Sequence, residues 1–111
     1  MEVEKVKDGL VVRLPHSRLD AARATEFRTG LAAAVDGHCL VVLDMSKVQY
    51  VDSAGLGAIV GVLKVMPKGC ELRLAHCTTP VRKIIELTRL DRVFPPFATV
   101  EAALAEPLPA A

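Results

Sequence analysis

The sequence predicts a single α/β domain with a mostly parallel, mixed β-sheet that has an antiparallel N-terminal edge. Short apolar runs alternate with longer segments of helical periodicity, which is typical of parallel strands joined by helices. The run LVVLD at residues 40–44 is apolar at consecutive positions, as in a strand that is covered on both faces. The pair Asp8-Gly9 between two apolar segments indicates a hairpin and therefore an antiparallel edge. The predicted order is β-β-α-β-α-β-α-β-α within residues 1–105, and residues 106–111 are expected to be a flexible Pro/Ala tail.

Composition restricts the possible functions of this 111-residue chain. Hydrophobic residues make up 51% and aromatic residues 4%, so the core must consist mainly of Leu, Val, Ile and Ala. The net charge of +1 gives no case for a nucleic-acid partner, and no apolar run reaches the roughly 18 residues that membrane insertion needs. Met1 is followed at once by charged residues, unlike a secretory signal. We expect the three cysteines to be reduced and packed, in a cytoplasmic protein; they are Cys39, Cys70 and Cys77.

The first half of the chain supplies the predicted hairpin and one helix before the central strand. Residues 3–7 and 10–14 are the two antiparallel strands, and residues 15–18 connect them to the helix. Asp20 is placed to cap this helix, which ends near Gly37. Its apolar face consists of Ala24, Phe27, Leu31, Ala34 and Val35.

The second half continues the alternation of helices and strands. Residues 67–69 form a turn, and residues 70–75 alternate with period two, as a strand does. Pro80 occupies the first position of the next helix. The inner face of that helix consists of Val81, Ile84, Ile85 and Thr88. Residues 93–97 can form only a short edge strand because two of them are prolines, and residues 99–104 form a final short helix.

The stretch VQYVDSAGLGAIVG, residues 48–61, is the candidate functional region. We expect Ser53 to cap a helix over residues 54–65 whose N-terminus faces solvent, because a serine oxygen accepts a hydrogen bond from a free backbone N–H. This helix is apolar nearly all round, which predicts that it is buried. Gly57 and Gly61 are four residues apart, so one face could approach a neighbouring element closely.

A serine hydrolase is an alternative that the residues do not favour. The order Ser53-Ala54-Gly55 resembles half of the nucleophile elbow G-x-S-x-G, but the first glycine is absent. Asp52 is adjacent to the serine and cannot serve as the distal member of a triad. His76, the only later histidine, is more simply the polar end of a strand. We therefore expect no enzymatic activity.

The sequence predicts neither a nucleotide cofactor nor a metal site. The glycines of residues 55–61 resemble a dinucleotide fingerprint, but they lie inside the helix rather than before it, and close packing explains them better. The three histidines lack ligand spacing among themselves or with the cysteines. A basic cluster is interpreted as a solvated helix face, with a partner-facing patch left open; it consists of Arg82, Lys83, Arg89 and Arg92.

A phosphorylation switch at Ser53 is the remaining hypothesis. A phosphate would add about −1.5 to −2 charge at pH 7, and a helix N-terminus tolerates an anion. Asp52 would repel the new charge, so the effect should fall mainly on a partner docked over this end. From the residues alone, the switch and a plain capping role both stay open.

The segment YVDSAGLG, residues 50–57, resembles the corresponding motif of STAS domains, as in the bacterial anti-sigma factor antagonists. The resemblance extends over nearly the whole chain. LVVLD at residues 40–44 looks like the central strand of the family, and IIELTRLDRVF at residues 84–94 looks like its third helix and the following turn. Residues 99–104 look like its last helix.

The resemblance implies an anti-sigma factor antagonist that controls sigma-factor-dependent transcription. Such a protein binds an anti-sigma factor serine kinase when it is unphosphorylated and is released on phosphorylation, until a phosphatase resets it. Ser53 would be the phosphoacceptor, and ATP and magnesium would belong to the kinase rather than to this chain. The resemblance assigns partner binding to Asp20, Asp52, Ser53, Ala54, Gly55, Leu56 and Gly57.

An alternative within the same family is a non-switching module, such as a scaffold or a small subunit of a lipid-transport system, in which Ser53 only caps the helix. We expect a monomer, with a dimer left open. The sequence departs from the family at Arg89, where glycine is frequent at a helix end, so the left-handed turn there is expected to be strained or replaced.

Overall fold

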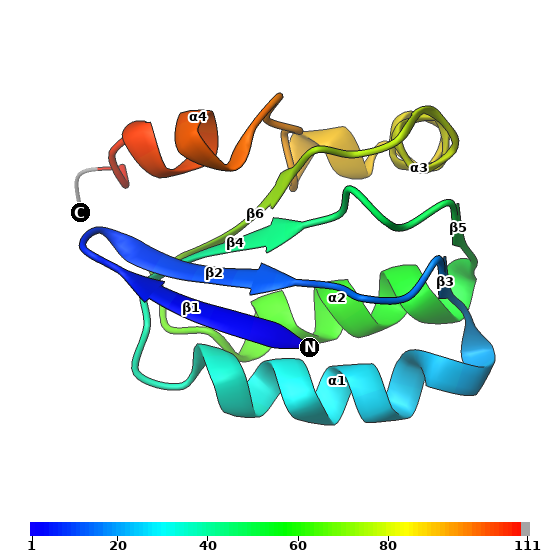
Figure 1. Cartoon of the computed structure of the whole chain (residues 1–111), viewed down its shortest axis with the longest axis horizontal. Helices are drawn as coiled ribbons and strands as arrows, with labels where there is room; N and C mark the ends of the chain where they lie inside the picture. The colour runs from blue at the N-terminus through cyan, green and yellow to red at the C-terminus, as the bar shows by residue number, and fades with distance from the viewer. Residues whose placement is uncertain (110–111) are drawn as a thin grey trace.

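The computed structural model describes residues 1–109 and shows a four-stranded mixed sheet between layers of helix (Figure 1). The strand order is β1-β2-β4-β6, with β1 antiparallel to β2 and the other two pairings parallel. This confirms the predicted α/β class and the antiparallel N-terminal edge. The strands of this sheet are β1 (Glu2–Val6), β2 (Gly9–Arg13), β4 (Leu40–Asp44) and β6 (Glu71–Ala75).

The hairpin turn lies one residue earlier than the sequence indicated. Val6 pairs with Gly9, so Lys7 and Asp8 form the turn and Gly9 is the first residue of β2. A Cβ atom on Gly9 would come within 2.7 Å of the carbonyl oxygen of Leu40. The glycine is therefore required by close packing of two strands rather than by the turn.

Helices α1 (Ala21–Val35) and α2 (Ser53–Val65) pack against each other on one side of the sheet (Figure 1). A second, smaller apolar cluster lies on the other face of the sheet, where α4 (Val100–Ala105) covers it. Helix α3 (Thr79–Leu87) lies beside β5 (Tyr50–Val51). The main core is apolar and lies between the sheet and the α1–α2 layer; its fully buried members include Leu10, Leu31, Leu43, Ile59 and Leu74.

The prediction of an all-round buried helix is wrong for α2. Only one face is buried, and Gly57 and Val65 are exposed. A Cβ on Gly57 would meet nothing within 4 Å, and the atoms nearest to one on Gly61 would be those of the Arg28 guanidinium group, at 3.2 to 3.3 Å. Gly61 therefore faces α1 closely and Gly57 does not, and the closest approach to another backbone occurs at Gly55, where a Cβ would overlap the carbonyl oxygen of Leu19.

A second sheet was missed because its strands are only two residues long. β3 (Arg18–Leu19) pairs in parallel with β5. A pair of residues has no periodicity, so the sequence predicts only a connection over residues 15–18. These two strands lead directly into α1 and α2, so they set the positions of both helix starts.

The predicted edge strand over residues 93–97 is wrong except at its end. Phe97 forms an isolated parallel bridge with Ala75, and the 3₁₀ helix η1 (Leu90–Arg92) precedes it. Consecutive prolines at 95 and 96 cannot donate to a ladder, so pairing begins only after them.

The expectation of three reduced cysteines is corrected by a disulfide between Cys39 and Cys70. The parallel register pairs Leu40 with Glu71, so the residues just before these two strands are brought together. Cys77 is free and buried, as predicted. The argument for a cytoplasmic compartment from three free thiols therefore loses its basis.

Arg73 is only 2% exposed, although the alternation of its strand points it away from the main core. Helix α4 covers this face, and the guanidinium donates hydrogen bonds to the carbonyl oxygens of Ala103 at 2.7 Å, Glu106 at 2.5 Å and Pro107 at 3.3 Å. The buried arginine thus holds the start of the segment that the sequence assigned to a tail. Residues 110 and 111 of that segment lie outside the described residues.

Candidate functional site

Ser53 is the first residue of α2 and is exposed. Asp52 alone separates it from β5, at the end of the molecule where β3 and β5 lead into the two helices (Figure 1). Among residues 1–109, no partner atom forms a hydrogen bond with its hydroxyl group. The expectation that Ser53 faces solvent at the start of a helix is confirmed.

The helix cap is Asp52 rather than Ser53, which corrects the sequence prediction. One carboxylate oxygen of Asp52 accepts a hydrogen bond from the backbone N–H of Gly55 at 3.0 Å. The other accepts from the backbone N–H of Ala21 at 3.1 Å, at the start of α1. A single carboxylate therefore satisfies donors at the N-termini of two helices.

These contacts favour the ionised form of Asp52. The hydrogen bond from the Gly55 N–H is the largest cause that lowers the pKa of Asp52, and the bond from Ala21 acts in the same direction. Desolvation acts in the opposite direction but does not prevail. The side chain next to Ser53 is thus a fixed negative charge.

Asp20 occupies the N-cap position of α1, as predicted, but its side chain makes no capping hydrogen bond. Its carboxylate accepts from Arg18 at 3.2 Å, and the Arg18 guanidinium lies 4.2 Å from the ring centroid of Tyr50. The remaining oxygen of Asp20 is buried and lacks a partner among the described residues. The amide of Ala21, the first residue of α1, donates to Asp52.

Packing fixes the start of α2 against β3. The backbone N–H of Asp52 donates to the carbonyl oxygen of Leu19 at 3.3 Å, and Gly55 leaves the room for that approach. The next residues face outward to different degrees, since Ala54 and Leu56 are half-buried and Gly57 is exposed. Most of the predicted site residues therefore lie on one surface at the start of this helix.

Sequence reasoning missed two residues of this surface, Arg18 and Tyr50. The spacing of Arg18 and Asp20 offered a weak signal, because side chains two apart on a strand lie on the same face. Nothing in the sequence places Tyr50 under the guanidinium, since the contact depends on the pairing of β3 with β5.

His76 does not serve Ser53 as a general base. Its Nε2 accepts a hydrogen bond from the backbone N–H of Val100 at 3.2 Å, at the start of α4. The backbone of His76 is left-handed, with φ of 57°. The hydrolase alternative therefore loses the only histidine that the sequence offered for it.

The basic cluster is exposed on and after α3, and no ion pair involves its members within residues 1–109. Arg89 has φ of 59°, so the left-handed helix end is kept with an arginine in place of glycine. Within the same residues, no group of three or more His, Cys, Asp or Glu could hold a metal, and no helix is long and apolar enough to cross a bilayer.

Comparisons with known proteins agree with this fold. The family model of the STAS domain matches residues 1–103. BtrV of Bordetella bronchiseptica, provisionally named an anti-sigma factor antagonist, is 33% identical over 88% of this chain and 86% of its own length. An anti-sigma F factor antagonist of Paenibacillus polymyxa is 28% identical over 96% of this chain and 92% of its own length. The crystal structure of an anti-sigma factor antagonist from Mycobacterium paratuberculosis superimposes with a TM-score of 0.83, at 28% identity, over 93% of this chain and 88% of that one.

Proposed function

Since the chain belongs to the STAS domain family, we propose that it is an anti-sigma factor antagonist switched by phosphorylation of Ser53. The unphosphorylated protein binds an anti-sigma factor serine kinase in the cytoplasm and so frees a sigma factor. The phosphorylated protein is released, and a phosphatase restores it. ATP and magnesium are held by the kinase, and this chain acts as a binding partner and substrate rather than as an enzyme.

The observation that carries the proposal is the division of roles between Asp52 and Ser53. Asp52 binds the helix N–H groups, so the exposed hydroxyl of Ser53 has no capping duty. A kinase can therefore modify that hydroxyl without removing a hydrogen bond that the fold needs. The non-switching alternative assumed that Ser53 is retained as a cap, and that reason does not apply here.

A phosphate on Ser53 would change the local charge much more than the fold. The N-terminus of α2 favours an anion. The Gly55 amide there already donates its hydrogen bond to the negatively charged carboxylate of Asp52. The phosphate adds about −1.5 to −2 beside that carboxylate, and a kinase surface that complements the neutral serine would meet this charge. Loss of partner binding therefore follows from repulsion and desolvation at the interface.

Gly57 offers a way to test the proposed partner surface without disturbing the domain. It is exposed, and a Cβ at this position meets no neighbour within 4 Å. A Gly57→Gln variant should fold at least as well as the wild type, because glutamine is the better helix former. We expect it to lose affinity for the kinase, whereas Lys64→Gln on the far end of α2 should not.

The direct test is incubation with the anti-sigma factor kinase and ATP. The chain has three serines, so Ser17→Ala and Ser46→Ala are matched controls for Ser53→Ala; both control positions are exposed. Only Ser53→Ala should abolish phosphate incorporation. Equal incorporation by all three variants would mean that the kinase phosphorylates another residue. In pull-downs, Ser53→Asp should weaken kinase binding relative to Ser53→Ala, and equal affinities would contradict the charge mechanism.

A further inference from the structure

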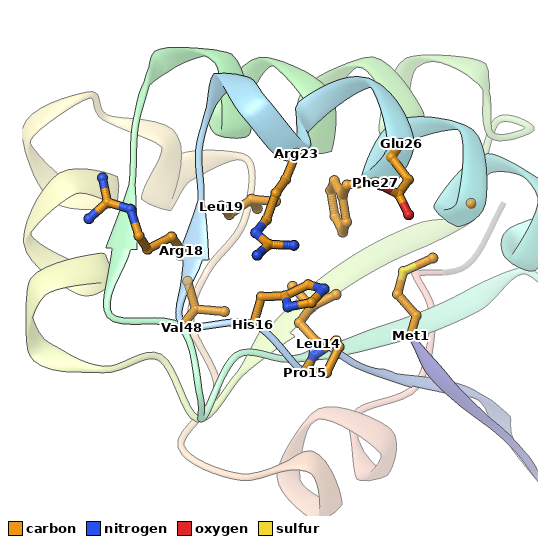
Figure 2. Close-up of a pocket in the computed structure, with 11 residues that line it drawn as sticks. Met1, Leu14, Pro15, His16, Arg18, Leu19, Arg23, Glu26, Phe27 and Val48 are labelled. Atoms are coloured by element: carbon orange, nitrogen blue, oxygen red, sulfur yellow. The ribbon is translucent and has the colours of Figure 1, made fainter.

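A cavity of about 260 Å³ lies between α1 and the segment that runs from the end of β2 through β3, next to the surface around Ser53, with which it shares Arg18 (Figure 2). Its inner wall is apolar and belongs to the core, with Leu14, Leu19, Phe27 and Val48 all buried. An engineered apolar cavity of about 150 Å³ holds benzene, so this one has room for a ring or a short chain together with a small polar group.

The mouth of the cavity carries positive charge. Arg23 from α1, Arg18 from β3 and His16 from the connection line it, and Glu26 is the acidic member at the other side. Figure 2 shows the Arg23 side chain reaching from α1 toward the segment that carries His16.

The two arginines of the mouth differ in their partners. Arg18 is engaged with the carboxylate of Asp20 and the ring of Tyr50. Within residues 1–109, no ion pair involves Arg23. One guanidinium at the mouth is therefore available to an anion, and a guanidinium binds a carboxylate through two parallel hydrogen bonds.

We propose that this cavity binds a small monocarboxylate with an aromatic or short aliphatic body. The body packs against Phe27 and Leu14, and the carboxylate pairs with Arg23 beside His16. A ligand with several negative charges fits poorly, because Glu26 lines the same mouth and only one arginine is free of a carboxylate. The apolar wall selects for the body of the ligand, and the one arginine of the mouth without an ion pair among the described residues selects for a single negative charge.

Leu19 connects the cavity to the surface around Ser53. The side chain of Leu19 forms part of the cavity wall, and its carbonyl oxygen accepts the hydrogen bond from the N–H of Asp52. A bound ligand is therefore expected to shift the backbone amide resonances of Asp52 and Gly55 as well as those of the residues that line the cavity.

Titration with phenylacetate, followed by ¹⁵N–¹H spectra in a carboxylate-free buffer, tests this proposal without the kinase. We expect saturable shifts at the amides of Phe27 and Leu19, and binding at least about tenfold weaker for the neutral isostere phenylacetamide. Arg23→Gln should weaken phenylacetate binding to a similar extent. Arg28→Gln is the matched control, since Arg28 is an exposed arginine of the same helix that does not line the cavity.

Three results would overturn the proposal. The first is the absence of saturable shifts with wild-type protein whose spectrum shows that it is folded. The second is equal binding of phenylacetate and phenylacetamide, which would leave no role for the cation. The third is an equal loss of affinity in the Arg23 and Arg28 variants, which would indicate a general charge effect.

Discussion

Replacement of Arg73 by methionine should destabilise the domain by about 3 kcal/mol, because the arginine is the donor for a set of carbonyl groups at the end of α4. The carbonyl of Ala103 is buried and would lose its partner, at a cost of about 1–3 kcal/mol. The carbonyls of Glu106 and Pro107 are partly buried and can be reached by water, so they add less. Loss of the guanidinium over the ring of Phe97, at 5.4 Å, adds about 0.5–1 kcal/mol.

Urea unfolding at pH 7 measures this free energy, and hydrogen exchange locates it. Methionine fills much of the same volume, so the loss should come from hydrogen bonds rather than from a cavity. Amides of α4 should lose protection more than those of β4, because the helix is only six residues long and depends on its contacts. Arg82→Met is the matched control, since Arg82 is exposed on α3 and should change stability by less than about 0.5 kcal/mol. A change of the same size in both variants would refute the reasoning.

Three further predictions concern the helix end, the shared cap and the disulfide. Arg89→Gly should stabilise the domain by about 1 kcal/mol in urea unfolding, because a left-handed backbone costs an arginine about that amount more than glycine; a destabilisation would indicate an unrecognised contact of the side chain. The folded-state pKa of Asp52 is lowered, so its contribution to stability is present above the unfolded pKa of about 3.9 and is lost as the pH falls through the folded pKa. The stabilities of the wild type and Asp52→Asn should therefore converge below pH 4, and a constant difference from pH 7 to pH 3 would contradict this assignment. Reduction of the Cys39–Cys70 bond, which closes a separation of 31 residues, should lower stability by about 3–4 kcal/mol, whereas Cys39→Ser/Cys70→Ser should show no response to reductant.

The sequence was sufficient for the sheet and the long helices because each has a period or a boundary residue that acts locally. The apolar run of β4 and the alternation of β6 predict strands, and proline at the start of α3 predicts a helix N-terminus. The errors occur where the deciding partner is distant in the chain. Cys39 lies next to Cys70 only because the N-terminal ends of the parallel strands β4 and β6 are aligned. Arg73 is buried only because α4 packs over its side chain.

The candidate site shows the same division. Its location at a strand-to-helix junction could be predicted, because both Asp52 and Ser53 are good capping residues. The spacing could not decide which of the two side chains caps α2, since each residue lies within one position of the helix start. The structure decides for Asp52 because its second oxygen binds the amide of Ala21, 31 positions earlier in the sequence. A carboxylate has two acceptor oxygens for two helices, whereas a single hydroxyl could not reach both donors.

This shared cap has a consequence for any signal at Ser53. Asp52 joins the starts of α1 and α2, and its backbone N–H holds Leu19, whose side chain faces the cavity at the other side of β3. The backbone of Asp52 therefore links the start of α2, where Ser53 lies, to a residue of the cavity wall. If a ligand in the cavity changes the affinity for a partner bound at Ser53, that partner must change the affinity for the ligand by the same factor, because coupling between two binding sites is reciprocal. The two-residue strand β3 is thus the element through which the cavity and the surface around Ser53 would be coupled.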